Sequence, residues 1–193
     1  MLAALAAASP QLRDMAWLSL KTGLRATEIF KLRAQDVDET AGVLYVTAKG
    51  GRREIVHAPQ DVISMLLTYG SVGGEYIFSS RNQGERIKST PDTFRRIVRK
   101  LGLDAAGGDS LYAVTFHTLR HTFASWLAQS GQVTLLELKE MMRHDSISMT
   151  QRYAHLIPGH AKKRLSIIDV TLHSSQKHSK SARPVVFTRP ASM

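Results

Sequence analysis

The chain has 193 residues, and its 26 lysines and arginines exceed its 16 acidic residues, which gives a formal charge of +10. This length allows one domain with a hydrophobic core. The positive charge favours a polyanionic partner bound through phosphates, although a merely soluble basic surface would have the same composition. The absence of cysteine excludes disulfides, thiolate metal sites and cysteine nucleophiles. No apolar run reaches the roughly 18 residues of a membrane span, so we expect a cytoplasmic protein without a membrane partner.

The first part of the chain is predicted to be helical. Residues 1–8 are apolar but lack a basic flank, which is typical of a helix rather than of a signal peptide. A second helix should begin at Pro10 and end near Gly23, because proline favours the first turn of a helix and glycine its end. Arg25 then lies in a turn, and a further helix is expected over 26–33.

A small antiparallel sheet is predicted next. The β-rich runs 42–48 and 53–57 are separated by a segment with two glycines, the pattern of a hairpin with Lys49 at its tip. A third short strand is expected over 76–78. Helices are predicted over 92–101, 116–129, 133–142 and 146–155. The expected fold class is therefore α+β, mainly helical.

The predicted helix over 116–129 has two distinct faces. At about 100° per residue, its apolar side chains fall on one side, and His117, Arg120 and His121 fall on another. We therefore expect it to bury the apolar face and to display these charged groups.

One face of the helix over 92–101 is basic. Such a face is often simply solvated, but in this chain we prefer a contact with a DNA backbone. The residues assigned to that contact are Arg95, Arg96, Arg99, Lys100 and, from a later turn, Arg143.

The composition changes towards the C-terminus. Residues 1–172 are predicted to form the folded domain, and 173–193 are rich in serine, lysine, arginine and proline, which is typical of a flexible tail. Val185 to Phe187 is a short apolar patch within it. We expect this tail to be solvated or exchanged with a neighbouring protomer, with the patch as its anchor.

Three motifs carry groups that can hold and attack a phosphodiester. The first is Thr22-Gly23-Leu24-Arg25-Ala26-Thr27-Glu28, the second is His117-Thr118-Leu119-Arg120-His121-Thr122, and the third joins His144-Asp145-Ser146 to Gln151-Arg152-Tyr153-Ala154-His155. Arginine forks suit phosphate oxygens, imidazole titrates near neutrality and a phenol can act as a nucleophile. Taken singly, each of these residues would more often be structural.

In this order the motifs resemble those of the tyrosine recombinases, the phage integrase family, from about Leu18 to Leu156. The resemblance implies a catalytic domain that breaks and rejoins double-stranded DNA through a 3′-phosphotyrosyl intermediate, with no metal or other cofactor. Recombination or integration of a mobile element would follow. The residues it makes catalytic are Arg25, Lys49, His117, Arg120, His144 and Tyr153.

The resemblance also gives each residue a role. Tyr153 is the nucleophile, Arg25 and Arg120 clamp the phosphate, His117 acts as an acid or base, and His144 holds a phosphate oxygen.

Lys49 protonates the leaving 5′-oxygen, while Glu28 orients Arg25 or caps its helix and His121 has a similar supporting role. His117 and His121 also have the i, i+4 spacing of a zinc pair, but Thr118 stands where a zinc protease needs glutamate, so no metal is expected.

Two departures from the family pattern keep an alternative open. Arg143 stands where the family usually has glycine before the histidine, and the first motif begins too early to leave room for the family's N-terminal DNA-binding domain. We expect a catalytic fragment or a truncated form, active as a tetramer on paired DNA sites and a monomer or weak oligomer without DNA. The alternative is a weakly active or inactive DNA-binding remnant that acts as a regulator.

Overall fold

The computed structural model describes residues 1–70, 75–80, 85–104 and 113–159, with the side chain of Lys49 outside this description. Met1–Ile157 form one compact unit. The predicted domain end at residue 172 and the tail over 173–193 lie outside the described residues. Within the described ranges, no helix combines the length and apolar character needed to cross a membrane.

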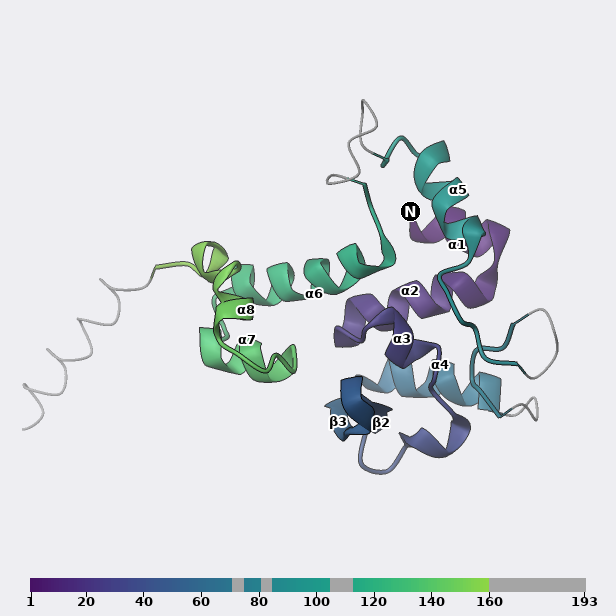
Figure 1. The fold of residues 1–193 in the computed structure, drawn as a ribbon, viewed down its shortest axis with the longest axis horizontal. Helices are drawn as coiled ribbons and strands as arrows, with labels where there is room; N and C mark the ends of the chain where they lie inside the picture. The colour runs from purple at the N-terminus through teal and green to yellow at the C-terminus, as the bar shows by residue number, and fades with distance from the viewer. Residues whose placement is uncertain (71–74, 81–84, 105–112, 160–193) are drawn as a thin grey trace, which may run out of the picture. The chain divides into compact units, whose positions relative to one another are not determined.

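Most of the described chain is helical (Figure 1). The α-helices are α1 (Leu2–Ala8), α2 (Pro10–Thr22), α3 (Ala26–Ile29), α4 (Gln60–Gly70), α5 (Asp92–Lys100), α6 (Phe116–Ser130), α7 (Leu135–Met141) and α8 (Ser148–Gln151). The helix predicted to begin at Pro10 is confirmed, and the hydroxyl of Ser9 accepts a hydrogen bond from its first turn. The helices predicted over residues 92–101 and 116–129 are also present.

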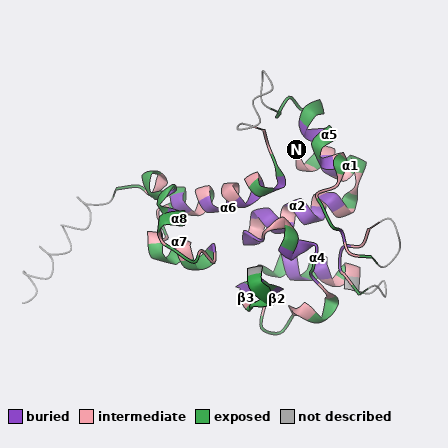
Figure 2. Ribbon diagram, viewed as in Figure 1, coloured by how far each residue is buried: buried purple, intermediate pink, exposed green. Residues whose placement is uncertain are grey.

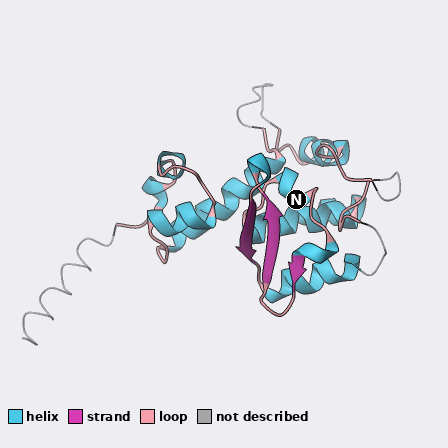
Figure 3. Cartoon of the chain, turned by 60° about the horizontal axis from the view of Figure 1, so that its bottom comes forward, coloured by secondary structure: helices cyan, strands magenta, loops and turns pink. Residues whose placement is uncertain are grey.

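The sheet has three antiparallel strands in the order β1 (Val37–Asp38), β2 (Val43–Thr47) and β3 (Arg53–His57) (Figure 3). The predicted hairpin is confirmed, and a 3₁₀ turn, η2 (Lys49–Gly51), joins its strands. The strand predicted over residues 76–78 is wrong. Only Ser79 there forms an isolated bridge, with Arg86, whereas β1 supplies the third strand.

Three predicted helices are shorter than expected. α3 ends at Ile29, because the chain then closes into turns with a hydrogen bond from the Lys31 amide to the Glu28 carbonyl. α7 covers only Leu135–Met141, and the helix predicted over 146–155 divides into α8 and a 3₁₀ turn, η4 (Ala154–Leu156).

α2 packs against α1, α3, α4 and α6, and its buried residues are visible along its length (Figure 2). It ends at Gly23, which has φ +67°, a left-handed conformation that favours glycine. A Cβ atom at Gly23 would lie 2.5 Å from Cδ1 of Phe123 on α6. The glycine therefore allows the end of α2 to approach α6 closely, which brings Arg25 near Arg120.

The buried apolar residues form two clusters. The larger one joins α1 to α5, the sheet and the first turn of α6, including Phe94 and Phe116. The smaller one joins the rest of α6 to α7 and the segment after α8, and the ring of Tyr153 belongs to it. Burial of this ring by packing fixes the position of the phenol.

Candidate active site

A cavity of about 200 Å³ brings the three sequence motifs together. Its lining, as far as the described residues form it, contains arginine and histidine side chains and no carboxylate. Such a lining attracts an anion, because cationic groups in a partly enclosed site concentrate positive potential. The lining residues are Arg25, His117, Arg120, His121, Met142, His144, Met149, Arg152 and Tyr153.

Arg25 is held at the start of α3 by Glu28. The backbone N–H of Arg25 donates to Oε2 of Glu28 at 2.8 Å, and its Nη1 donates to Oε1 of the same carboxylate at 2.8 Å. The side chain of Glu28 is buried, whereas about a third of the Arg25 side chain, 32%, is exposed. Glu28 thus caps α3 and orients a guanidinium whose remaining donors can reach a ligand.

Arg120 is buried rather than displayed, so the prediction that it lies on an exposed helix face is wrong. Its Nη1 and Nη2 donate to the carbonyls of Gly23 and Met142. Burial and, to a smaller extent, the charges of Arg25 and Arg143 together lower the pKa of Arg120 to about 10. The side chain remains cationic at neutral pH, and a guanidinium has five N–H donors, of which these carbonyls take two.

His121 contacts the phenol of Tyr153. Its Nδ1 shares a hydrogen bond with the phenol oxygen. The sequence predicted a supporting position for His121 and an acid–base role for His117, whose ring lies 4.5 Å from that of His121 between centroids. Among the described residues, no group of three or more histidine or carboxylate side chains is placed to hold a metal.

The cavity favours neutral histidines and a neutral tyrosine. Loss of solvent, and to a smaller extent nearby positive charges, lower the pKa of His121 and of His144, the latter to about 4. Loss of solvent and the charge of Arg120 likewise lower the pKa of His117. Burial raises the pKa of Tyr153 above its ordinary value, although Arg152 acts in the opposite direction. Neutral imidazoles can accept a proton from the phenol.

His144 is oriented by its own segment. Its Nδ1 shares a hydrogen bond with the hydroxyl of the buried Thr150 at 2.9 Å, and its backbone N–H donates to the carbonyl of Lys139. These contacts turn the other ring nitrogen away from Thr150. His144 lines the cavity, as do Arg25, Arg120 and Tyr153.

Arg143 makes ion pairs where a DNA contact was predicted. Its Nη2 lies 2.6 Å from Oε2 of Glu28, and its Nε lies 3.1 Å from Oε2 of Glu54 on β3. Only 9% of its side chain is exposed. The side chain of Arg143 is thus directed towards two carboxylates of the protein. One of them, Glu54, lies outside the three sequence motifs and was not predicted to take part in the site.

The basic face of α5 is exposed. Arg95, Arg96, Arg99 and Lys100 are on the surface, while Phe94 and the other apolar residues of the helix are buried. Arg95 and Arg99 form long ion pairs, at 3.4 Å and 3.7 Å, with nearby carboxylates. The charge of this face therefore remains accessible to a polyanion.

Arg152 and Lys49 are the two remaining residues of interest. Arg152 lines the cavity and is exposed. No role was predicted for it from the sequence, although it directly precedes Tyr153 in the third motif. The backbone of Lys49 lies in the turn between β2 and β3, while the placement of its side chain lies outside the described residues.

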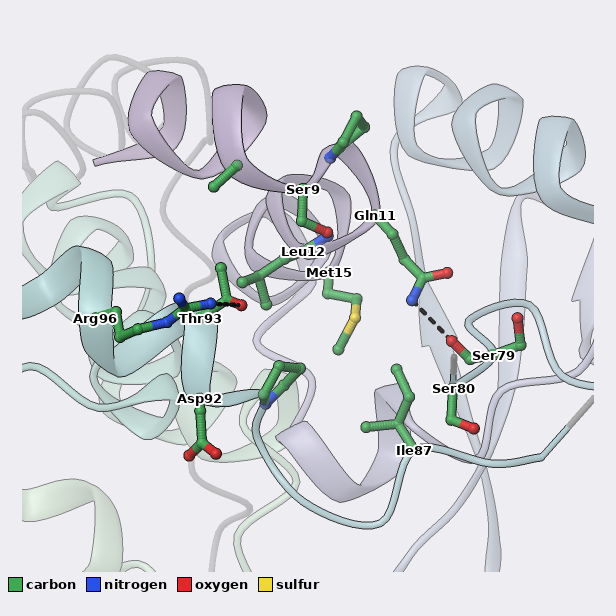
Figure 4. Close-up of a pocket in the computed structure, with 13 residues that line it drawn as sticks. Ser9, Gln11, Leu12, Met15, Ser79, Ser80, Ile87, Asp92, Thr93 and Arg96 are labelled. Carbon is green, nitrogen blue, oxygen red and sulfur yellow. Dashed lines mark hydrogen bonds between the residues drawn. The ribbon is translucent and has the colours of Figure 1, made fainter. Parts of the chain in front are cut away.

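A larger cavity of about 880 Å³ lies between the start of α2 and the segment before α5 (Figure 4). Its polar groups are largely engaged with one another: Gln11 donates to the carbonyl of Ser79, and Arg96 donates to Thr93. The described residues that line it include no histidine or tyrosine. Size alone therefore does not identify the candidate site, and the smaller cavity is the one that contains the motif residues.

A tyrosine held by histidine in an arginine-lined cavity, on a mainly helical domain with a small sheet, defines the catalytic-domain class of the tyrosine recombinases. The model of the phage integrase family matches residues 1–160, and the chain belongs to that family. It is 33% identical over 157 residues to the tyrosine recombinase XerD of Staphylococcus epidermidis, a match that covers 78% of this chain and 52% of XerD. The integrase of Salmonella phage P22 is 30% identical over 187 residues, which cover 88% of this chain and 46% of the integrase.

Solved structures show the same fold. The catalytic domain of bacteriophage HP1 integrase has a TM-score of 0.63 and 25% identity, and the match covers 86% of this chain and 87% of that domain. The integrase of transposon Tn1549 has a TM-score of 0.65 at 20% identity, covering 88% of this chain and 63% of that chain. The chain spans about half the length of the curated relatives it matches.

Proposed function

We propose that this chain is the catalytic domain of a site-specific DNA recombinase that acts through Tyr153. The phenol oxygen attacks the phosphorus, a bond forms between tyrosine and the 3′-phosphate, and the bond to the 5′-oxygen breaks. Attack by a 5′-hydroxyl reverses the reaction and releases the tyrosine. The observation that carries the proposal is that Tyr153, Arg25 and Arg120 line one cavity, to which the described part of the chain contributes no carboxylate.

The arginines stabilise the charge that develops on the phosphate. Arg25 has an exposed fraction that a ligand can reach, and Arg120 lies behind it with three N–H donors beyond the two its carbonyl partners take. Preorganised cations cost no reorganisation when the transition state forms. His144 and the exposed Arg152 line the same cavity and complete the anion site.

Two proton transfers accompany the exchange. The phenol proton goes to His121, because its Nδ1 contacts the phenol oxygen and burial favours its neutral form. His117, whose ring lies 4.5 Å from that of His121 between centroids, relays the proton. The leaving 5′-oxygen takes a proton from Lys49, a role that rests on the family resemblance and the position of Lys49 in the hairpin turn.

Double-stranded DNA is the proposed partner. The Tn1549 integrase structure is a complex with circular intermediate DNA, and another relative in fold is a lambda integrase dimer bound to a core site. The exposed basic face of α5 supplies contacts with the DNA backbone.

A tetramer forms on paired sites, and residues 173–193 link protomers. Deletion of these residues leaves cleavage by one protomer intact and weakens assembly on paired sites in a gel-shift measurement.

The test is incubation of the protein with nicked suicide DNA, followed by a denaturing gel. The parent forms a covalent adduct, Tyr153→Phe forms none but binds DNA equally well, and Tyr45→Phe serves as the matched control that still forms it. Chelators leave the yield unchanged. A parent that binds DNA but gives no adduct would instead be the regulatory remnant.

A further inference from the structure

The backbone of Arg143 has the conformation that a glycine prefers. Its φ is +50°, and among the described residues it is the single non-glycine with a positive φ. An L side chain rarely adopts this region without compensation from its surroundings. The family usually has glycine at this position. The presence of arginine therefore points to side-chain contacts that Arg143 makes and that a glycine could not make.

Those contacts form an ion triad in which Glu28 is buried and Arg143 and Glu54 are partly buried. The guanidinium of Arg143 pairs with Glu28 at 2.6 Å and with Glu54 at 3.1 Å, and the side chains of the two carboxylates are 2% and 14% exposed. Removal of Arg143 would leave two carboxylates close together without their shared counter-charge.

The triad joins three segments. Glu28 holds Arg25 at the start of α3, and Glu54 lies on β3, opposite Val46 in the register of the hairpin. The carbonyl of Arg143 accepts a hydrogen bond from Nη2 of Arg25 at 3.4 Å. The turn before His144 is therefore tied to α3 through side chain and backbone, and to the sheet through the side chain.

Arg52 forms a second link between the hairpin and this turn. It donates to Glu54 through Nε at 3.0 Å, and its Nη2 lies 3.6 Å from Asp145, the residue after His144. Arg52 is exposed, so this pair is screened by solvent and contributes little by itself. The Arg143–Glu54 pair and the Arg52–Asp145 pair nevertheless connect the same end of the hairpin to the same turn.

We infer that Arg143 is a positioning residue, which locks the β2–β3 hairpin and the Arg25 turn onto the segment that carries His144. The inference rests on the proposed function for its effect on catalysis. Since the hairpin turn contains Lys49, loss of the lock moves the acid relative to the scissile bond. It slows protonation of the leaving oxygen more than attack by Tyr153.

Two DNA substrates test this effect. Arg143→Gly removes the guanidinium and relieves the backbone, and should cleave ordinary suicide DNA about 10-fold or more slowly with unchanged duplex affinity. It should cleave DNA with a bridging 5′-sulfur at nearly the parental rate, because a thiolate leaves without a proton. Glu54→Gln, which keeps the shape of the side chain, should show the same pattern if Arg143→Gly folds poorly.

Arg53→Ala is the matched control. It removes a positive charge from the same strand, but Arg53 pairs with Asp36 and stacks on Tyr45, away from the His144 turn. It should leave both rates unchanged. Equal slowing of Arg143→Gly and Glu54→Gln on both substrates, or no slowing on either, would overturn the inference.

Amide hydrogen exchange separates this inference from the proposed function, because it requires no activity. In Arg143→Gly the amides of residues 43–57 should exchange about tenfold faster than in the parent, while Arg53→Ala should leave those beyond its own neighbours unaffected. Unchanged exchange in Arg143→Gly would contradict a lock on the hairpin. If the parent formed no adduct but Arg143→Gly still exchanged faster than the parent, the proposed function would be refuted, while the inference that Arg143 holds the hairpin would be supported.

Discussion

His121 and Tyr153 share a hydrogen bond between a ring nitrogen and the phenol oxygen, although 32 positions separate them in the chain. α6 supplies the histidine, and the turn between α8 and η4 supplies the tyrosine. The tyrosine ring is buried in the smaller apolar cluster, so the two groups meet through packing. The contact places a neutral base against a phenol whose ionisation is disfavoured by burial.

Substitution of His121 should therefore slow cleavage without weakening DNA binding. His121→Ala should reduce the single-turnover cleavage rate by about 10² or more, the usual range for removal of a general base. His117→Ala, which lacks the direct contact with the phenol, should lose less. The measurement is adduct formation with saturating enzyme, from pH 6 to about 9, where the His121 variant should gain rate with rising pH. A smaller loss in His121→Ala than in His117→Ala would return the acid–base role to His117.

Arg25 is predicted to act in the transition state rather than in affinity. Arg25→Ala should lower the cleavage rate by about 10² while duplex affinity changes little, because affinity is shared among many phosphate contacts. Arg96→Ala on the exposed face of α5 is the control with the opposite expectation: weaker, more salt-dependent binding and a normal rate at saturation. Binding isotherms at several salt concentrations and single-turnover rates would distinguish them. Normal cleavage by saturated Arg25→Ala would exclude a role in the clamp.

Sequence patterns predicted α2, α5, α6, the hairpin and the motif residues that meet in the cavity, but they did not predict α4. The start of α2 at Pro10 and the hairpin around Lys49 followed from local propensities, which act through neighbouring residues. The strand β1 was missed because it has only two residues and forms through pairing with β2. Patterns within one segment do not reveal such a pairing.

The positions of charged groups were harder to predict. Arg120 was assigned to a displayed helix face by its period, but carbonyls of Gly23 and Met142 from other elements allow it to be buried. Likewise, nothing near Glu54 in the sequence shows that it faces Arg143, 89 positions later. Both contacts depend on tertiary packing, which cannot be predicted from the periodicity of apolar residues along one helix or strand.

Gly23 connects stability with the arrangement of the site. Gly23→Ala should lower the free energy of unfolding by about 1–3 kcal/mol, because a Cβ would clash with Phe123 and the residue would keep a positive φ. The Gly23 carbonyl also accepts a hydrogen bond from Arg120, so cleavage should slow as well. Gly102→Ala is the control, since its φ is +63° but, apart from its chain neighbours, no atom of the described residues lies within 4 Å of its Cβ position. Urea denaturation would measure both, and equal losses would show that the close approach to Phe123 contributes nothing.

The pH dependence of stability should report on His144. Its pKa in the folded protein is lowered to about 4, below the roughly 6.5 of an unfolded chain. Between these values the unfolded state binds more protons, so stability falls as pH decreases from about 7 towards 4, and falls no further from this group once the folded state is protonated as well. His144→Gln removes this contribution, and its unfolding free energy should therefore decline less steeply over that window. His121 and His117 have lowered pKa values too, so part of the decline should remain. The check is urea denaturation at intervals from pH 4 to about 8, with the exposed His155→Gln as control. A decline in His144→Gln as steep as in the parent would mean that His144 titrates alike in both states, and that the cavity does not hold it neutral.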